Sequence, residues 1–285
     1  MLVLALVVLL GWPPFRGVIF SNDFRPFPDA LHFDFDKTEF FQFLLHIEAH
    51  YNKTTTYHTN IHAADVTHST FCLISIDSLN EILTPLEKFA AILSAVIHDV
   101  DHTGYNNVFL ENTTHELALN YNDQSVQENH HLSTAFKLMT CEGMNTITKK
   151  LQEVDDEGNS EWKIFRNFVI NMVLGTDMNK HPETLAHLKT LTELKLITTN
   201  ELGLDKPQDR LMILKNVLHC ADLGNPTKTT KTYTWWADQV MKEFWAQGDA
   251  EKLKQMTVSR GFDRNDSNMA SMQIGFIDYR MLRRV

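Results

Sequence analysis

The chain has 285 residues, of which 43% are hydrophobic and 22% are charged, and its formal net charge is −10. This composition is typical of a soluble globular protein with a large core, in one large domain or two small ones. The negative charge argues against nucleic acid and against an anionic membrane surface as the main partner. Three widely spaced cysteines (Cys72, Cys141 and Cys220) contain no CxxC pair. We therefore expect a reducing, cytoplasmic environment without a disulfide framework.

The N-terminal segment, residues 1–30, begins with a wholly apolar run from Met1 to Leu10. Ten residues are too few to span a bilayer as a helix. The run also lacks the basic residues and the small-residue cleavage site of a secretory signal. Two interpretations stay open, a helix at the domain edge or cut end of a longer chain, and a truncated membrane anchor through which the protein would contact a membrane.

Helical spacing dominates the chain from about residue 31 onward, and strand-like alternation is scarce. Phe40, Phe43, Leu44 and Ile47 recur at the spacing of an amphipathic helix. The run Thr84-Pro85-Leu86-Glu87 combines an N-cap, a proline at the first helical position and a glutamate at the third.

That second helix would continue to Val96 and place His98 and Asp99 at its C-terminal end. Similar spacing predicts helices over Trp162 to Leu174, Pro207 to Ala221 and Thr232 to Gln247, and residues 155–160 form a polar loop. The sequence therefore predicts an all-α fold.

Three segments place imidazoles and carboxylates beside apolar helical stretches. They are Tyr57 to Asp65, Ala95 to His102 and His219 to Pro226. Buried charge is costly unless it is paired or bound to metal. A metal-centred hydrolase is therefore the first hypothesis, because bound cations would let an acidic enzyme hold a phosphate ester.

Within these segments, His62, His98, Asp99 and Asp222 suit Zn²⁺ as a set of two imidazoles and two carboxylates. Asp99 could bridge to a harder second ion, Mg²⁺ or Mn²⁺. On a helix, His58 and His62 would share one face. This spacing fits either two zinc ligands or one ligand and one proton donor.

Four further motifs occur in a fixed order along the chain. They are Glu116 to Asp123, Ser125 to His131, Gly175 to His181 and Met272 to Tyr279. Together with the segments above, they closely resemble the catalytic domain of class I 3′,5′-cyclic-nucleotide phosphodiesterases, within the HD-type metallophosphohydrolases. The match runs from about Phe33 to Tyr279. It implies a compact multi-helix catalytic domain over residues 31–285, with a deep two-metal pocket, truncated at both ends and with an incomplete C-terminal helix.

The resemblance also implies roles for individual residues. It makes His62, His98, Asp99 and Asp222 the metal ligands, with Zn²⁺ in the first site, Mg²⁺ or Mn²⁺ in the second, and Asp99 shared. His58 matches the proton donor to the leaving O3′. His102, Glu128 and Thr176 match positions around the waters of the second ion, although helix-surface and capping roles are the alternative for Glu128 and Thr176. The substrate pocket would contain Tyr57, Asn225, Val240, Phe244, Gln273 and Phe276.

The implied function is hydrolysis of cAMP, cGMP or both to the 5′-monophosphate, with no nucleic-acid partner. Gln273 can pair with either purine, because flipping its amide exchanges the donor and the acceptor. Two rival functions stay open. One is an HD-type phosphohydrolase for other nucleotides, and the other is a cyclic-nucleotide sensor or fragment with weak catalysis. The sequence leaves the preferred purine and the oligomeric state undetermined.

Overall fold

The computed structural model describes residues 35–154, 158, 160–199 and 204–278. The regular secondary structure of the described residues is helical, and their only β pairing is an isolated bridge between Val154 and Ser160. The apolar segment 1–30 and most of the polar loop 155–160 lie outside the described residues. The helices, in chain order, are α2 Lys37–His50, α3 Asn60–Ile74, α4 Asp77–Asn80, α5 Pro85–Ile97, α6 Asn107–Asn112, α7 Glu116–Tyr121, α8 Val126–Thr140, α9 Thr146–Gln152, α10 Glu161–Leu174, η2 Met178–Lys180, α11 His181–Thr199, α12 Pro207–Asp222, η3 Asn225–Thr227, α13 Thr230–Leu253 and α14 Met269–Phe276.

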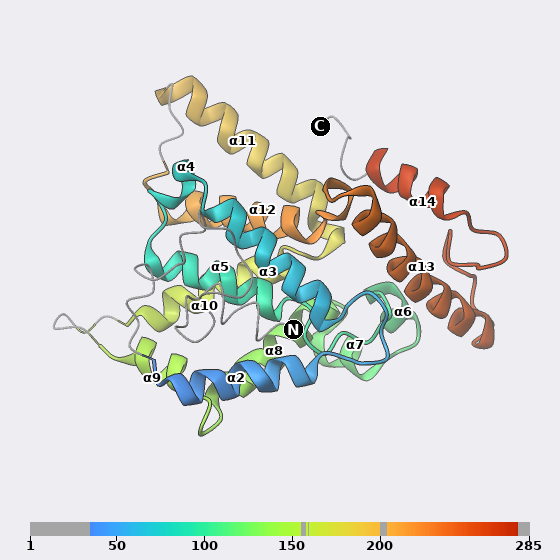
Figure 1. The fold of residues 1–285 in the computed structure, drawn as a ribbon, viewed down its shortest axis with the longest axis horizontal. Helices are drawn as coiled ribbons and strands as arrows, with labels where there is room; N and C mark the ends of the chain where they lie inside the picture. Colours follow the sequence, from blue (N-terminus) through green and yellow to red (C-terminus); the bar gives the residue numbers. More distant parts are fainter. Residues whose placement is uncertain (1–34, 155–157, 159, 200–203, 279–285) are drawn as a thin grey trace.

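Helix α5 lies at the centre of the fold, with α3, α10 and α12 packed around it (Figure 1). Its residues from Leu86 to Ile97 are all buried. The predicted start is confirmed, because the Thr84 side chain accepts from the Glu87 N–H and the Glu87 side chain accepts from the Thr84 N–H. This capping box satisfies two backbone donors that a helix N-terminus otherwise leaves unpaired. The sequence thus specifies both the burial of α5 and the residue at which it begins.

The apolar stripe predicted for the first helix is also confirmed, since Phe40, Phe43, Leu44 and Ile47 are the buried residues of α2. Helix α10 and helix α12 match their predicted ranges within one residue. Helix α13 is longer than predicted, since it begins after the Thr229 N-cap and extends to Leu253.

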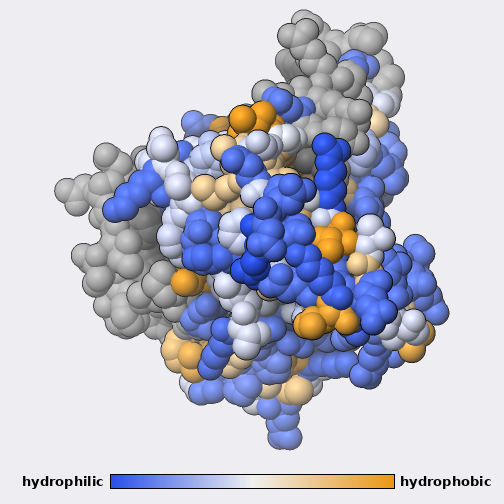
Figure 2. All heavy atoms as spheres, turned by 90° about the vertical axis from the view of Figure 1, so that its right-hand side faces the viewer, coloured by the Kyte–Doolittle hydropathy of each residue, from blue (hydrophilic) through white to orange (hydrophobic). Residues whose placement is uncertain are grey.

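Helices α6, α7, α13 and α14 lie together on one side of the molecule (Figure 1). The face on that side is mainly hydrophilic, with scattered apolar patches (Figure 2). The large apolar side chains exposed on these four helices are Val108, Leu119, Trp235, Leu253 and Ile274. No helix in the described part of the chain is both long and apolar enough to cross a bilayer.

Candidate metal centre and substrate pocket

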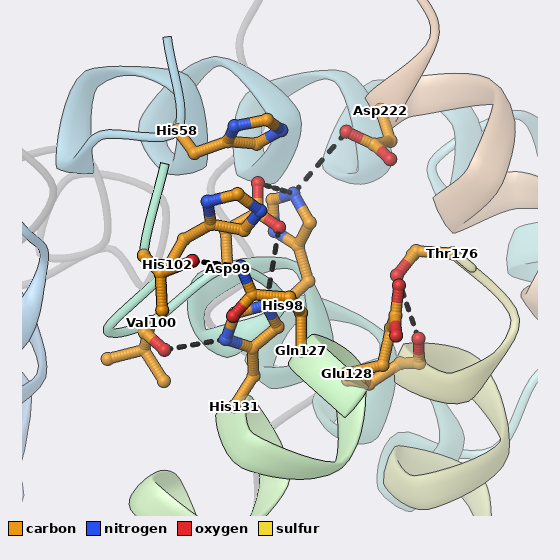
Figure 3. Close-up of polar contacts among 12 residues, drawn as sticks. His58, His98, Asp99, Val100, His102, Gln127, Glu128, His131, Thr176 and Asp222 are labelled. Atoms are coloured by element: carbon orange, nitrogen blue, oxygen red, sulfur yellow. Dashed lines mark hydrogen bonds and ion pairs between the residues drawn. The ribbon is translucent and has the colours of Figure 1, made fainter. Parts of the chain in front are cut away.

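The ends of three helices bring the four predicted ligands together. His62 lies in the first turn of α3, His98 caps the C-terminal end of α5 with Asp99 next to it, and Asp222 is the last residue of α12. Helix α3 packs against both α5 and α12. Figure 3 shows Asp222 extending from the end of its helix toward the imidazoles. One potential ligand atom from each of the four residues lies within 4.8 Å of the others.

The closest contacts in this cluster join imidazole nitrogens to carboxylate oxygens. His62 Nε2 lies 2.9 Å from Asp222 Oδ1, and His98 Nε2 lies 3.0 Å from Asp99 Oδ2. The diagonal contacts, His62 to Asp99 and His98 to Asp222, are each 3.4 Å long. Each carboxylate therefore faces both rings.

The donor set fits a divalent cation. His98 Nδ1 bonds to the Ala95 carbonyl at 2.8 Å, which turns Nε2 toward the carboxylates. Despite their proximity, His98 Nε2 and Asp99 Oδ2 make no hydrogen bond, and both atoms are buried. Buried polar atoms without a hydrogen bond are costly. A metal ion would satisfy both, and an imidazole oriented by a backbone carbonyl is the usual arrangement of a histidine ligand.

Electrostatics keeps the two carboxylates of the cluster ionised. Burial alone would raise the pKa of Asp99, but the charge of His98 outweighs it and holds that pKa well below its usual range. Burial likewise opposes ionisation of Asp222, but its hydrogen bond to His62 and the nearby charge of His98 lower its pKa. Anionic carboxylates are the form that binds divalent cations.

A second cluster lies beside the first and consists of His58, His102 and Glu243. His58 Nδ1 donates to the Glu243 carboxylate, which also accepts the Tyr57 N–H at 2.9 Å. The rings of His58 and His102 stack with their centroids 3.8 Å apart. Burial would lower the pKa of His58, but the negative charge of Glu243 outweighs it and raises the pKa to about 9. His58 is thus held in its protonated form near neutral pH.

The prediction that His58 and His62 share a helix face is wrong. The side chain of Thr59 accepts from the His62 N–H and caps α3, so the helix begins at Asn60 and His58 precedes it. His58 is therefore positioned by Glu243 of α13 rather than by the geometry of a helix.

Three further residues are expected near the second ion. His102 and Thr176 are buried, and Glu128 is partly buried. His102 stacks between His58 and His131. Glu128 accepts from Asn107 at 2.9 Å, and burial together with Asp177 raises its pKa to about 7. The Thr176 hydroxyl donates to the Val173 carbonyl at 2.8 Å. In the structure, Thr176 thus makes the local helix-end contact that was its alternative role.

Residues of the expected substrate pocket come from the segment before α3 and from the C-terminal helices. The Asn225 amide donates to the Tyr57 hydroxyl at 2.6 Å. Val240 and Phe244 lie on α13, and Phe244 stacks on Phe262 with a centroid distance of 4.4 Å. Gln273 and Phe276 lie on α14, which packs against α13.

Three residues that the sequence reasoning did not assign to the site contact it. Glu243 bonds to His58, Tyr233 donates to Gln273 Oε1 at 3.0 Å, and His131 Nε2 lies 3.8 Å from Asp99 Oδ1. A signal existed for Glu243. Glu243 follows Trp236 by seven residues, which is about two helical turns, so the two side chains lie on the same face of α13. Because Trp236 is buried, this spacing places a charged side chain on a buried face.

Asp65, three residues after His62 on α3, forms an ion pair. Its carboxylate accepts from Lys228 at 2.8 Å, and Lys228 also donates to Ser69.

The comparisons with known proteins agree with this fold. The model of the 3′5′-cyclic nucleotide phosphodiesterase family matches residues 57–283. The chain therefore belongs to the 3′5′-cyclic nucleotide phosphodiesterase family.

Two kinds of relatives are similar over most of the chain. A 3′,5′-cyclic-AMP phosphodiesterase of Drosophila melanogaster, isoform F, is 44% identical over 241 residues, which are 84% of this chain and 35% of that protein. Isoforms N/G are 44% identical over 24% of their length. The chain thus spans about a third or less of these relatives. The crystal structure of the phosphodiesterase domain of the RhoPDE fusion protein from the choanoflagellate Salpingoeca rosetta has a TM-score of 0.78 and 33% identity, over 88% of this chain and 75% of that one.

Proposed function

We propose that this chain hydrolyses the 3′ phosphoester bond of a 3′,5′-cyclic nucleotide to give the nucleoside 5′-monophosphate, with residues 31–285 as the catalytic domain. The observation that carries the proposal is the convergence of four metal-ligand atoms beside a histidine whose positive charge is held by a buried carboxylate. Family membership supports the same reaction.

Two divalent cations would be held by His62, His98, Asp99 and Asp222, with Zn²⁺ in the first site and Mg²⁺ or Mn²⁺ in the second. The imidazoles suit zinc, and a harder ion prefers carboxylate and water oxygens. When bound, such ions supply positive charge for the phosphate and activate a water nucleophile.

His58 would act as the general acid. Its Nδ1 is bonded to Glu243, which leaves Nε2 to donate a proton to the leaving O3′. Without that proton, the ribose oxygen would leave as an alkoxide, which is a poor leaving group at neutral pH. Glu243 orients the ring and stabilises its charge, as an oriented carboxylate does in other acid–base pairs.

We propose that adenine is the preferred purine. A freely rotating glutamine amide would serve both purines, whereas the hydrogen bond from the Tyr233 hydroxyl to Gln273 Oε1 would hold the amide in one orientation and so favour one purine over the other. The choice of adenine is supported by the Drosophila relatives, which bear the name of cyclic-AMP phosphodiesterases.

The experiment is turnover of cAMP and of cGMP by the purified chain in Mg²⁺ or Mn²⁺, with metal analysis of the same sample. We expect release of 5′-AMP, and we expect kcat/KM for cAMP to be higher than kcat/KM for cGMP. Binding of cyclic nucleotide without release of 5′-monophosphate would favour the sensor instead. Activity restricted to other nucleotides would favour the general HD-type phosphohydrolase.

A further inference from the structure

A buried ion pair joins the N-terminal ends of α5 and α12. Glu87, in the first turn of α5, is 3% exposed. The Arg210 Nε atom lies 2.9 Å from Glu87 Oε1 and 3.0 Å from Oε2. None of the predicted site residues takes part in this contact.

Both partners of this pair are fixed to their surroundings by further hydrogen bonds. Glu87 Oε2 accepts from the Thr84 N–H as part of the capping box. Arg210 Nη1 donates to the carbonyls of Leu204 and Asp205, immediately before α12. The pair therefore connects the rigid start of one helix with the rigid start of the other.

The two helices run in the same direction (Figure 1). Asp222 is the last residue of α12, and Asp99 lies two residues beyond the end of α5. Twelve positions separate Glu87 from Asp99, and twelve separate Arg210 from Asp222. At a rise of 1.5 Å per residue, the helical part of this distance is about 15 Å from Glu87 to Ile97 in α5 and about 18 Å from Arg210 to Asp222 in α12. The ion pair thus links the two helices at positions that lie the same number of residues before the two carboxylates of the cluster.

Axial register matters because the cluster tolerates little displacement. A slide of one helix along the other by a single residue moves its ligand by about 1.5 Å, whereas metal sites need their ligands within roughly 0.5 Å. The hydrophobic effect that drives apolar packing is non-directional, so it does not by itself choose between neighbouring registers. An arginine–carboxylate contact in which both oxygens are engaged is directional.

Net stability is a poor explanation for this pair. Removing two charges from water is costly, so replacing a buried pair by apolar residues is often neutral or stabilising. Specifying register is the better-attested use of such a pair.

We propose that Glu87 and Arg210 are positioning residues that fix the axial register of α5 and α12 and so hold Asp99 and Asp222 at metal-binding distance. The inference rests on the proposed metal site. It concerns metal affinity, and it can be tested without cyclic nucleotide.

The test is Mn²⁺ titration calorimetry on the chelator-stripped full chain, together with thermal unfolding of the metal-free protein. The variant Glu87→Gln/Arg210→Met keeps an acceptor for the Thr84 cap and removes the ion pair. We expect its Mn²⁺ affinity to fall by on the order of tenfold or more, as for other residues that orient metal ligands. Its metal-free unfolding temperature should stay the same or rise.

Two control variants separate register from general destabilisation. Ile147→Ala opens a cavity in α9, and Glu39→Gln removes the Lys149–Glu39 ion pair between α2 and α9. Neither should change Mn²⁺ affinity, although Ile147→Ala should unfold at a lower temperature.

An unchanged Mn²⁺ affinity in the folded double variant would overturn the inference. If that variant does not fold, Arg210→Lys decides, since it keeps the charge and loses the planar fork. It should weaken Mn²⁺ binding, and an affinity equal to that of the wild type would again count against the proposal. A wild-type chain that binds Mn²⁺ but releases no 5′-monophosphate would disprove the proposed function alone.

Discussion

The proposed role of His58 as the general acid can be tested directly by mutation. If it is the general acid, His58→Ala should lower kcat by on the order of 10²–10⁴. Its bound metal content should equal that of the wild type, because His58 is not among the four residues of the metal cluster. A normal kcat in this variant, measured with cAMP at saturating concentration, would remove His58 from the mechanism.

The pairing of His58 with Glu243 predicts a pH dependence. Because the pKa of His58 is raised to about 9, the protonated form persists through neutral pH and is lost as the pH rises past that value. The groups facing the ring include Glu243, Asp99 and Asp222, which all favour its charge. Glu243→Gln removes the strongest of them, so the alkaline limb of the kcat profile should move to lower pH.

The matched control for this pH prediction is Asp238→Asn, which removes an exposed carboxylate on the same helix. Asp238 pairs with Lys242 rather than with His58. The alkaline limb of the kcat profile of Asp238→Asn should coincide with that of the wild type. Movement of the limb in Asp238→Asn but not in Glu243→Gln would contradict the role given to Glu243.

The contact between Tyr233 and Gln273 predicts a change in purine selectivity. Tyr233→Phe removes the hydroxyl that donates to Gln273 Oε1, so the amide can rotate. We expect the ratio of kcat/KM for cAMP over cGMP to move toward one, by several-fold. Gln273→Ala should instead raise KM for both nucleotides. Steady-state kinetics with both substrates measures the two effects, and an unaltered ratio in Tyr233→Phe would show that another group orients the amide.

At the scale of elements, the close approach of α13 to the segment after it depends on Gly248. A Cβ atom at this position would lie 2.0 Å from the Phe262 carbonyl oxygen. Gly248→Ala must therefore displace the segment that carries Phe262, whose ring stacks on Phe244. We expect a loss of about 1–3 kcal/mol in the free energy of unfolding and a higher KM for cAMP, with unchanged metal content.

A helical glycine with open space around it provides the comparison for Gly248. A Cβ at Gly275 of α14 would meet nothing within 4 Å, so Gly275→Ala should not lower the unfolding temperature. Equal unfolding temperatures for the two alanine variants, measured by circular dichroism, would show that α13 and Phe262 are not tightly packed at this point.

The elements also show how far sequence reasoning reaches. Capping and apolar spacing are local, so the start of α5 and the buried face of α2 could be read directly from the sequence. The pair of His58 and Glu243 could not, because 185 residues separate the partners and only packing joins them. The HxxxH spacing misled for a local reason. Thr59 between the two histidines is itself an N-cap, and it excludes His58 from the helix.

At the scale of the whole molecule, the proposed metal site is a junction between helices that are far apart in the sequence. Its ligands come from the start of α3 and the ends of α5 and α12, the helices around which the main core is built. Ions bound there would join these elements in the folded state only, since the unfolded chain keeps the same ligands far apart. Metal binding should therefore stabilise the entire fold.

The size of this stabilisation follows from linkage. A metal at about 100 times its dissociation constant contributes roughly 2.7 kcal/mol to folding. For a chain of this size, that corresponds to a rise of about 4–5 °C in the unfolding temperature. Thermal unfolding followed by circular dichroism, with EDTA in one sample and Mn²⁺ in the other, measures the difference. Asp222→Asn removes one of the four ligands, so its response to Mn²⁺ should be much smaller than that of the wild type. A wild-type unfolding temperature that is the same in EDTA and in Mn²⁺ would mean that the three helix ends do not form a metal site.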